Sequence, residues 1–336
     1  MTTRTIPRAL SAGLLVLGLL TYTESLDWRG TRFGGFFLTP NMVVPSVGLA
    51  DWGGAREGRP VYQHALTAID GMPVASSSEA YARIRAHHLG DSVAFTFAYQ
   101  GQIEERRLPV SPFDSRDHFL IFGTYLVNGA MYLLLAALAA ERWREGGPFP
   151  GLAAFGWVGA TFAFTAIDLY GPGHLFRLHV LAESMLVGAA AHVTIGCLRM
   201  SPARRAGALK LAYGIPLSLA GAYEMMLHEP AAYSAIHNVA QALGIVPVLA
   251  LVGVLALGES RLAPELTTTG ARHVLAGAFV GVVVPAALLA VSGVAGGLVP
   301  VNAVAWVAFV FPLACIAAFP QLLPQRVRPV LARAIG

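Results

Sequence analysis

The stretch FLIFGTYLVNGAMYLLLAALAA, residues 119–140, decides the fold class of this chain. It contains no Asp, Glu, Lys, Arg or His, and it is long enough for a helix to cross the roughly 30 Å hydrocarbon core of a bilayer. Similar apolar runs recur from Phe119 to the C-terminus. The sequence therefore predicts a mainly α-helical polytopic membrane protein.

The composition of the whole chain agrees with this class. Hydrophobic residues make up 55% of the 336 positions and charged residues only 12%, about half the usual share in soluble proteins. The formal net charge is +4, but no basic stripe interleaved with aromatic residues predicts nucleic-acid binding. Cys197 and Cys315 both fall in apolar runs, so they predict neither a disulfide framework nor a cysteine-rich metal site.

The apolar runs divide the chain into four segments. Residues 1–26 are predicted to form an N-terminal membrane anchor, 27–116 a soluble domain, 117–320 a seven-helix block and 321–336 a basic tail. We expect the anchor to remain uncleaved, because no small-x-small cleavage site follows its apolar run. With the anchor there are about eight predicted spans, and the other seven lie near residues 119–140, 152–170, 178–198, 209–227, 235–257, 274–294 and 298–319.

Arginine and lysine predict the orientation of these spans. In the eight-span arrangement they gather on one side, and the short loops of the other side hold only Arg177. Such asymmetry marks the cytoplasmic side, so we expect a bacterial inner (plasma) membrane protein with both termini in the cytoplasm and the soluble domain outside it. The residues on the positive side are Arg4, Arg8, Arg142, Arg144, Arg199, Arg204, Arg205, Lys210, Arg261, Arg272, Arg326, Arg328 and Arg333.

The soluble segment has the pattern of a small β-rich domain with one or two helices. Apolar residues alternate through 93–99, as in a half-buried strand. Gly71 after Asp70 indicates a tight turn between strands. Residues 76–87 are predicted to form a helix that serine caps and that carries Glu79 in its first turn.

Three stretches of this segment together resemble a PDZ domain. They are Gly34-Gly35-Phe36-Phe37, Val43-Val44-Pro45-Ser46-Val47 and Ala65-Leu66-Thr67-Ala68-Ile69-Asp70-Gly71-Met72-Pro73-Val74. In that family the glycine-rich turn binds a peptide carboxylate through backbone N–H groups, and the resemblance implies the same role for Gly34, Gly35, Phe36 and Phe37. Gln63-His64 replaces the usual Gly-Asp pair, so a PDZ-shaped module that binds no peptide is an equal alternative.

The order of anchor, external PDZ-like domain, junction at 113–117 and seven-helix block is similar to the membrane half of bacterial sensor histidine kinases of the competence-pheromone receptor type. Leu181-Ala182-Glu183-Ser184, Ala191-His192 and Phe311-Pro312-Leu313-Ala314 also resemble segments of those sensors. The resemblance implies the input module of a two-component-like system. Its expected partners are membrane lipids, a peptide or lipophilic signal, a cytoplasmic kinase or other output protein, and a second copy of the chain in a homodimer. No cytoplasmic segment is long enough for kinase domains, so we expect a truncated or split sensor, or a stand-alone relative.

Polar side chains recur at one level in the outer part of the predicted third to sixth spans. Three pairs have i,i+4 spacing, which places each pair on one helix face, and we expect these faces to converge on a cavity open to the outside. The predicted ligand-binding residues are Asp168, His179, Glu183, Glu224, His228, His237, Asn238 and Gln241. Three interpretations are open: a pocket for a small or lipophilic signal with Trp157 and Tyr170 in its walls, a metal site, or structural pairing between helices.

Catalytic motifs give little support to an enzyme. The sequence has neither the His-Glu-x-x-His motif of intramembrane metalloproteases nor a Gly-x-Ser-x-Gly elbow. We therefore assign no catalytic residue, metal ligand or cofactor, and we expect a protein that senses or couples a signal. The alternatives are a PDZ-type membrane scaffold and a seven-helix metal-dependent hydrolase, the latter built from His179, Glu183, Glu224, His228 and His237.

Overall fold

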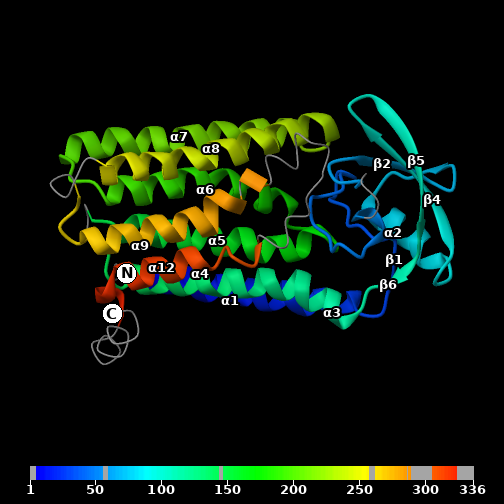
Figure 1. Ribbon diagram of the computed structural model, residues 1–336, viewed down its shortest axis with the longest axis horizontal. Coiled ribbons are helices and arrows are strands. Elements are labelled where there is room, and N and C mark those ends of the chain that lie inside the picture. The colour runs from blue at the N-terminus through cyan, green and yellow to red at the C-terminus, as the bar shows by residue number, and fades with distance from the viewer. Residues whose placement is uncertain are drawn as a thin grey trace.

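The computed structural model describes residues 5–55, 60–143, 147–256, 262–285, 287–288 and 305–323. The described chain is mainly helical, with a small β region at one end of a long helical bundle (Figure 1). The helices are α1 (Thr5–Ser25), α2 (Ser77–Ala86), α3 (Ser115–His118), α4 (Thr124–Ala140), α5 (Phe149–Leu169), α6 (Phe176–Gly196), α7 (Pro202–Met226), α8 (Pro230–Ala256), α9 (Thr268–Ala278) and α12 (Val310–Ala318). Short 3-10 turns occupy Leu26–Trp28, Gly53–Ala55 and Pro320–Leu322, and π-helical turns occupy Phe119–Gly123 and Phe279–Val283.

Five helical segments are long and apolar enough to cross a membrane. They are Thr5–Trp28, Ser115–Ala140, Phe149–Leu169, Phe176–Gly196 and Pro230–Val254. The prediction of several membrane helices is confirmed at this level, whereas the count of eight is not. The predicted span at 209–227 lies almost wholly in α7, which is long enough but less apolar, because Lys210 and Glu224 fall within that stretch. The predicted spans at 274–294 and 298–319 lie partly outside the described residues.

Proline and short polar side chains mark the helix boundaries. Pro150 lies in the first turn of α5, and α7 and α8 begin at Pro202 and Pro230. Proline suits this position because the first N–H groups of a helix have no partner within it. Asp114 caps α3 by accepting a hydrogen bond from the backbone N–H of Asp117, and this cap ends the β region.

The long helices run back and forth along the bundle, so one set of connections faces the β region and the other lies at the far end (Figure 1). The α1, α5 and α7 helices run toward the β region, and α4, α6 and α8 run away from it. The far end therefore holds Arg142 after α4, Arg199 between α6 and α7, and Arg204 and Arg205 at the start of α7.

The β region contains a four-stranded antiparallel sheet in the order β3-β2-β4-β5. Its strands are β2 (Ala65–Ile69), β3 (Met72–Pro73), β4 (Ser92–Tyr99) and β5 (Gln102–Pro109), and a separate pair joins β1 (Arg32–Phe33) to β6 (Ser111–Pro112).

Three local predictions for this region are confirmed. Asp70 and Gly71 form the β2–β3 turn, with positive φ angles of 50° and 73°. Ser76 caps α2, because its side chain accepts the backbone N–H of Glu79. The alternating residues of 93–99 form β4, the longest strand together with β5.

One aromatic core joins the β region to the bundle. The ring of Phe37 stacks on Tyr170 at the end of α5, with ring centres 4.9 Å apart, and Phe37 is fully buried. The indole N–H of Trp52 donates to Asp117 Oδ2 at 3.0 Å, and the Asn41 amide donates to the Leu227 carbonyl at 2.9 Å. The β region is therefore seated on the end of the bundle and not held by a linker.

We expect Phe37→Ala to lower the free energy of unfolding by about 3–5 kcal/mol, because it removes a fully buried ring from a packed core. Melting followed by the fluorescence of the buried Trp28 and Trp52 would measure the change. Phe119→Ala provides the matched control: this ring is 55% exposed, and its loss should change stability by about 0.5 kcal/mol or less. Equal losses from both variants would contradict a shared core.

Candidate functional site

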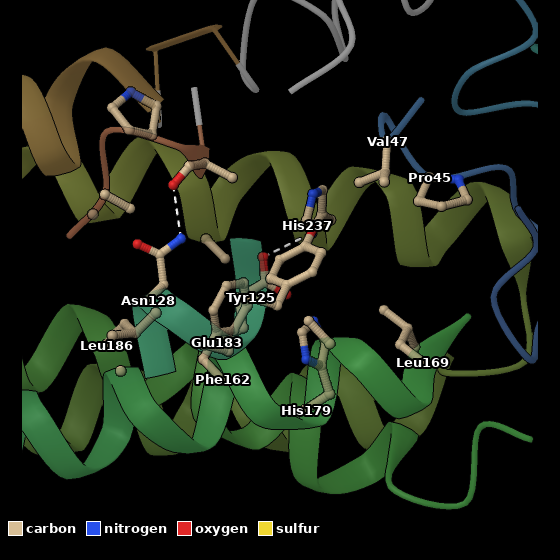
Figure 2. A pocket seen from close by; sticks show the side chains of 18 of the residues that line it. Pro45, Val47, Tyr125, Asn128, Phe162, Leu169, His179, Glu183, Leu186 and His237 are labelled. Carbon is tan, nitrogen blue, oxygen red and sulfur yellow. Dashed lines mark hydrogen bonds and ion pairs between the residues drawn. The ribbon is translucent and has the colours of Figure 1, made fainter. Parts of the chain in front are cut away.

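A cavity of about 230 Å³ lies where the β region meets the bundle. Its walls come from the loop at 39–47, from Gln63, and from the inner faces of α4, α5, α6 and α8. Figure 2 shows Pro45 and Val47 at one end of the view and Asn128 toward the other, with Glu183 and His237 between them. Most of the lining is apolar, as is usual for a small-molecule site.

An ion pair forms the main polar feature of the cavity wall. Glu183 Oε1 on α6 lies 2.7 Å from His237 Nδ1 on α8, and the side chain of Glu183 is only 3% exposed. Tyr223 on α7 is fully buried, and its hydroxyl donates to Glu183 Oε2 at 2.9 Å. Three helices therefore meet at one carboxylate, and each of its oxygens has a partner.

Burial makes this arrangement costly to disturb. An ionised carboxylate far from water is stable only when other groups pair with it. Tyr233 lies parallel to the His237 ring, with centres 6.0 Å apart, and helps to bury it. The Glu183 group can therefore hold α6, α7 and α8 together, and it also presents polar atoms to a molecule in the cavity.

His179 is the second histidine of the cavity wall. It lies one turn before Glu183 on the same face of α6, and its Nδ1 is 3.0 Å from the Thr165 hydroxyl on α5. Its ring stacks on Phe162, with centres 4.5 Å apart. His179 is thus fixed by α5, and the predicted i,i+4 face of His179 and Glu183 does face a cavity.

Among the described side chains, His179, Glu183 and His237 are the predicted site residues that line the cavity. Asp168 lies at the end of α5, where its carboxylate accepts the backbone N–H of Leu175 at 2.7 Å and closes the α5–α6 turn.

The predicted pair Glu224 and His228 lies elsewhere. Glu224 is on the outer surface of α7 and pairs with Arg177 at 3.1 Å, and His228 is exposed in the turn before α8. The predicted hydrolase set of three histidines and two glutamates is therefore not assembled. Among the described residues, no group of three His, Cys, Asp or Glu side chains is placed to hold a metal ion.

Asn238 and Gln241 complete the predicted set. Asn238 does not line the cavity, and its Oδ1 is buried with no hydrogen-bond partner among the described residues. The Gln241 side chain lies outside the described part of the structure. Tyr170 does line the cavity, as predicted, whereas Trp157 donates to Ser11 on α1 and lies away from it.

The sequence prediction missed Tyr223 and Asn128. The sequence prediction selected the charged neighbour Glu224 in place of Tyr223, but Glu224 faces outward. A tyrosine within a span is itself a signal, because a buried hydroxyl needs a partner. Asn128 on α4 is 4% exposed and lines the deeper part of the cavity. Its position as a lone amide within a strongly apolar stretch was the available sign.

The segment proposed to bind a peptide end is packed inside the protein. Phe36 packs edge-on against Phe95 and Phe97 of β4, and Phe37 lies in the core shared with the bundle. Gly35 has a φ of +81° and its carbonyl accepts the backbone N–H of Gly54. Peptide binding by Gly34, Gly35, Phe36 and Phe37 stays a prediction.

The Glu183–His237 pair can be tested with a double-mutant cycle. We expect His237→Leu to lower the free energy of unfolding by about 3–5 kcal/mol, because it leaves a buried carboxylate without its ionic partner. Adding Glu183→Leu should recover part of this loss, since the unpaired charge is then gone. The cycle for Arg177 and Glu224, both more than half exposed, should give a coupling of about 1 kcal/mol or less. Similar couplings for the two pairs would contradict the assigned burial.

No protein-family model matches this sequence, and no curated protein or solved structure shows significant similarity to it. The functional argument therefore depends on the cavity and on the polar groups in its wall.

Proposed function

We propose that this protein is a membrane sensor whose signal is a small lipophilic molecule bound in the cavity beside Glu183 and His237. The observation that carries the proposal is the composition of the cavity wall, which includes both the loop at 39–47 of the β region and helices of the bundle. A bound molecule would contact both parts at once. The resemblance to the membrane half of sensor histidine kinases supports the same role.

Coupling follows from the position of the ion pair. A ligand shifts a conformational equilibrium by its difference in affinity for two states. A molecule that contacts Glu183 and His237 bears on α6 and α8, and through Tyr223 on α7. These helices continue to the arginine-rich end of the bundle, where an output partner such as a kinase would receive the change.

The proposed location is a plasma membrane, with the β region outside the cell. The arginine-rich connections lie at the end of the bundle remote from the β region, and positive charge favours the cytoplasmic side. The same charge pattern supports a cytoplasmic position for both termini. The α1 helix supports a membrane role as well, since Leu15, Val16, Leu19 and Leu20 are at least half exposed on its surface.

A cavity-filling substitution tests the binding step. Gly244 of α8 lines the cavity, and a side chain added there would meet no atom within 4 Å of its Cβ. Gly244→Phe should therefore fill the cavity without disturbing the helix. The apolar photolabel trifluoromethylphenyl diazirine should then label α6 and α8 about tenfold less than in the wild type. Gly253→Phe is the matched control, because Gly253 lies on the exposed side of the same helix with equally open space.

Hydrogen exchange tests the coupling in the same samples. Photolabel in the cavity should slow amide exchange at residues 39–47 and change it at the α6–α7 turn, in the wild type and in Gly253→Phe but not in Gly244→Phe. Labelling that is equal in all three proteins would refute the cavity as a binding site. Labelling without any change in exchange at the α6–α7 turn would refute its role in sensing.

Orientation can be measured by adding one exposed cysteine at a time. The native Cys197 and Cys315 are both buried and can be left in place. Ile103 lies next to the β4–β5 turn and is 77% exposed. We therefore expect Ile103→Cys to react with a membrane-impermeant maleimide in intact spheroplasts. Arg204→Cys should react only after permeabilisation, because the positive end of the bundle is placed in the cytoplasm. The reverse pattern would invert the proposed topology.

A further inference from the structure

We propose that the molecule bound in the cavity is a small protonated lipophilic amine, whose ammonium N–H donates to His179 Nε2 and whose charge is balanced by Glu183. This inference rests on the proposed binding function and adds the chemistry of the ligand. It is carried by these two polar side chains, which lie one turn apart on α6, and by the aromatic rings of the cavity wall.

The hydrogen bonds of Thr165 fix the tautomer of His179. The Thr165 hydroxyl lies 2.7 Å from the Thr161 carbonyl, and because a carbonyl only accepts, the single hydroxyl hydrogen lies between these two oxygens. The hydroxyl oxygen is then the acceptor toward His179 Nδ1 at 3.0 Å, so Nδ1 carries a hydrogen. In the neutral ring the other nitrogen, Nε2, therefore holds a lone pair and accepts a hydrogen bond.

The Nε2 atom of His179 is open to a ligand. It makes no hydrogen bond within the described part of the chain, and it is not one of the unpaired polar atoms that are fully enclosed there. His179 is only 6% exposed and lines the cavity, so the surface left to Nε2 is that of the cavity. Figure 2 shows its ring on the side of α6 where Glu183 and His237 lie. A donor brought by a ligand would give this nitrogen a partner.

The charges of the wall favour a cation. Glu183 brings a carboxylate, and none of the described lining residues is Lys or Arg. Because a carboxylate only accepts, His237 Nδ1 carries a hydrogen whether its ring is neutral or protonated, and the pair has a net negative charge when the ring is neutral. Tyr223 donates to the second oxygen without adding charge. An ammonium beside this pair is balanced, whereas a carboxylate would be repelled.

Aromatic rings form much of the remaining wall. Phe162 stacks on His179 with ring centres 4.5 Å apart, and Tyr233 lies parallel to the ring of His237. The other aromatic lining residues are Tyr125, Tyr132, Phe155 and Tyr170. Aromatic faces attract alkylammonium groups, and the rings also bury the apolar part of the ligand. The cavity lies below the usual range of about 300–1,000 Å³ for ligand pockets, which favours a small amine.

Competition against the apolar photolabel tests this chemistry, with the full chain in lipid nanodiscs at about pH 8. Cyclohexylamine, cyclohexanol and cyclohexanecarboxylate share one ring, and at this pH the amine is a cation, the acid an anion and free imidazole neutral. Their effects on labelling of α6 and α8 by trifluoromethylphenyl diazirine are compared at equal mole fractions in the membrane. We expect the amine to compete about five- to tenfold better than the alcohol, because a charged donor makes the stronger hydrogen bond, and the carboxylate to compete least.

Two variants separate the two contacts. Glu183→Gln keeps the size and the polar character of the side chain but removes its charge, so the ratio of amine to alcohol affinity should fall to about one or two. His179→Leu removes the acceptor, which strengthens binding of the charged donor more than that of the neutral one, so the ratio should fall about threefold. Each ratio compares two ligands on the same folded sample, so a general loss of stability cancels.

Glu224→Gln and His192→Leu are the matched controls. Glu224 is more than half exposed on α7, where it pairs with Arg177. His192 lies on α6 like His179, but its Nδ1 is 3.0 Å from the Tyr213 hydroxyl. Neither residue lines the cavity, so the ratio should not change in either variant.

Equal competition by amine and alcohol in the wild type, or strongest competition by the carboxylate, would overturn the assigned ligand chemistry. A ratio that survives unchanged in Glu183→Gln or in His179→Leu would also overturn it. If Gly244→Phe abolishes photolabelling while the amine shows no preference, the binding function stands and this inference alone fails. If the photolabel does not enter the cavity of the wild type, the proposed function fails with it.

Discussion

The stacking of Phe37 on Tyr170 is the contact on which the rest of the structure depends. It fixes the β region to the end of α5 and places the loop at 39–47 over the cavity. A soluble domain on a linker would leave this end of the bundle open to water, and the Glu183 carboxylate would then need no partner. The shared aromatic core thus keeps the cavity dry. In a dry cavity the polar side chains of the wall must pair with one another or with a bound molecule.

The Glu183 group is the second constraint. Inside a membrane bundle, lipid is as apolar as the helix surfaces, so helices gain no hydrophobic preference for one another and depend on close packing and polar contacts. Gly156 shows the packing: a Cβ there would lie 2.6 Å from the Tyr132 carbonyl of α4. Between α6, α7 and α8, the carboxylate with its histidine and tyrosine provides the polar contact. Disturbing it alters three helices together.

Apolar run length was sufficient to predict several helices long enough to cross a membrane, and turn and capping residues predicted the β2–β3 turn and the start of α2, because each is a local property of the chain. In a helix surrounded by lipid, the hydrophobic pattern does not show which face points inward, since the lipid-facing side is apolar too. The i,i+4 spacing therefore identified one face with His179 and Glu183 and another with Glu224 and His228, and could not tell that only the first faces the cavity. Asn128 carried no spacing partner at all.

The energetics of a small ligand limit how the proposed sensor would work. Moving a two-state equilibrium from one extreme to the other requires a difference in affinity of about 10⁴, or roughly 5.5 kcal/mol. A very small ligand gains at most roughly 1.5 kcal/mol per heavy atom, and only the part of this gain that differs between the two states shifts the equilibrium. The two states must therefore be nearly balanced before the ligand arrives.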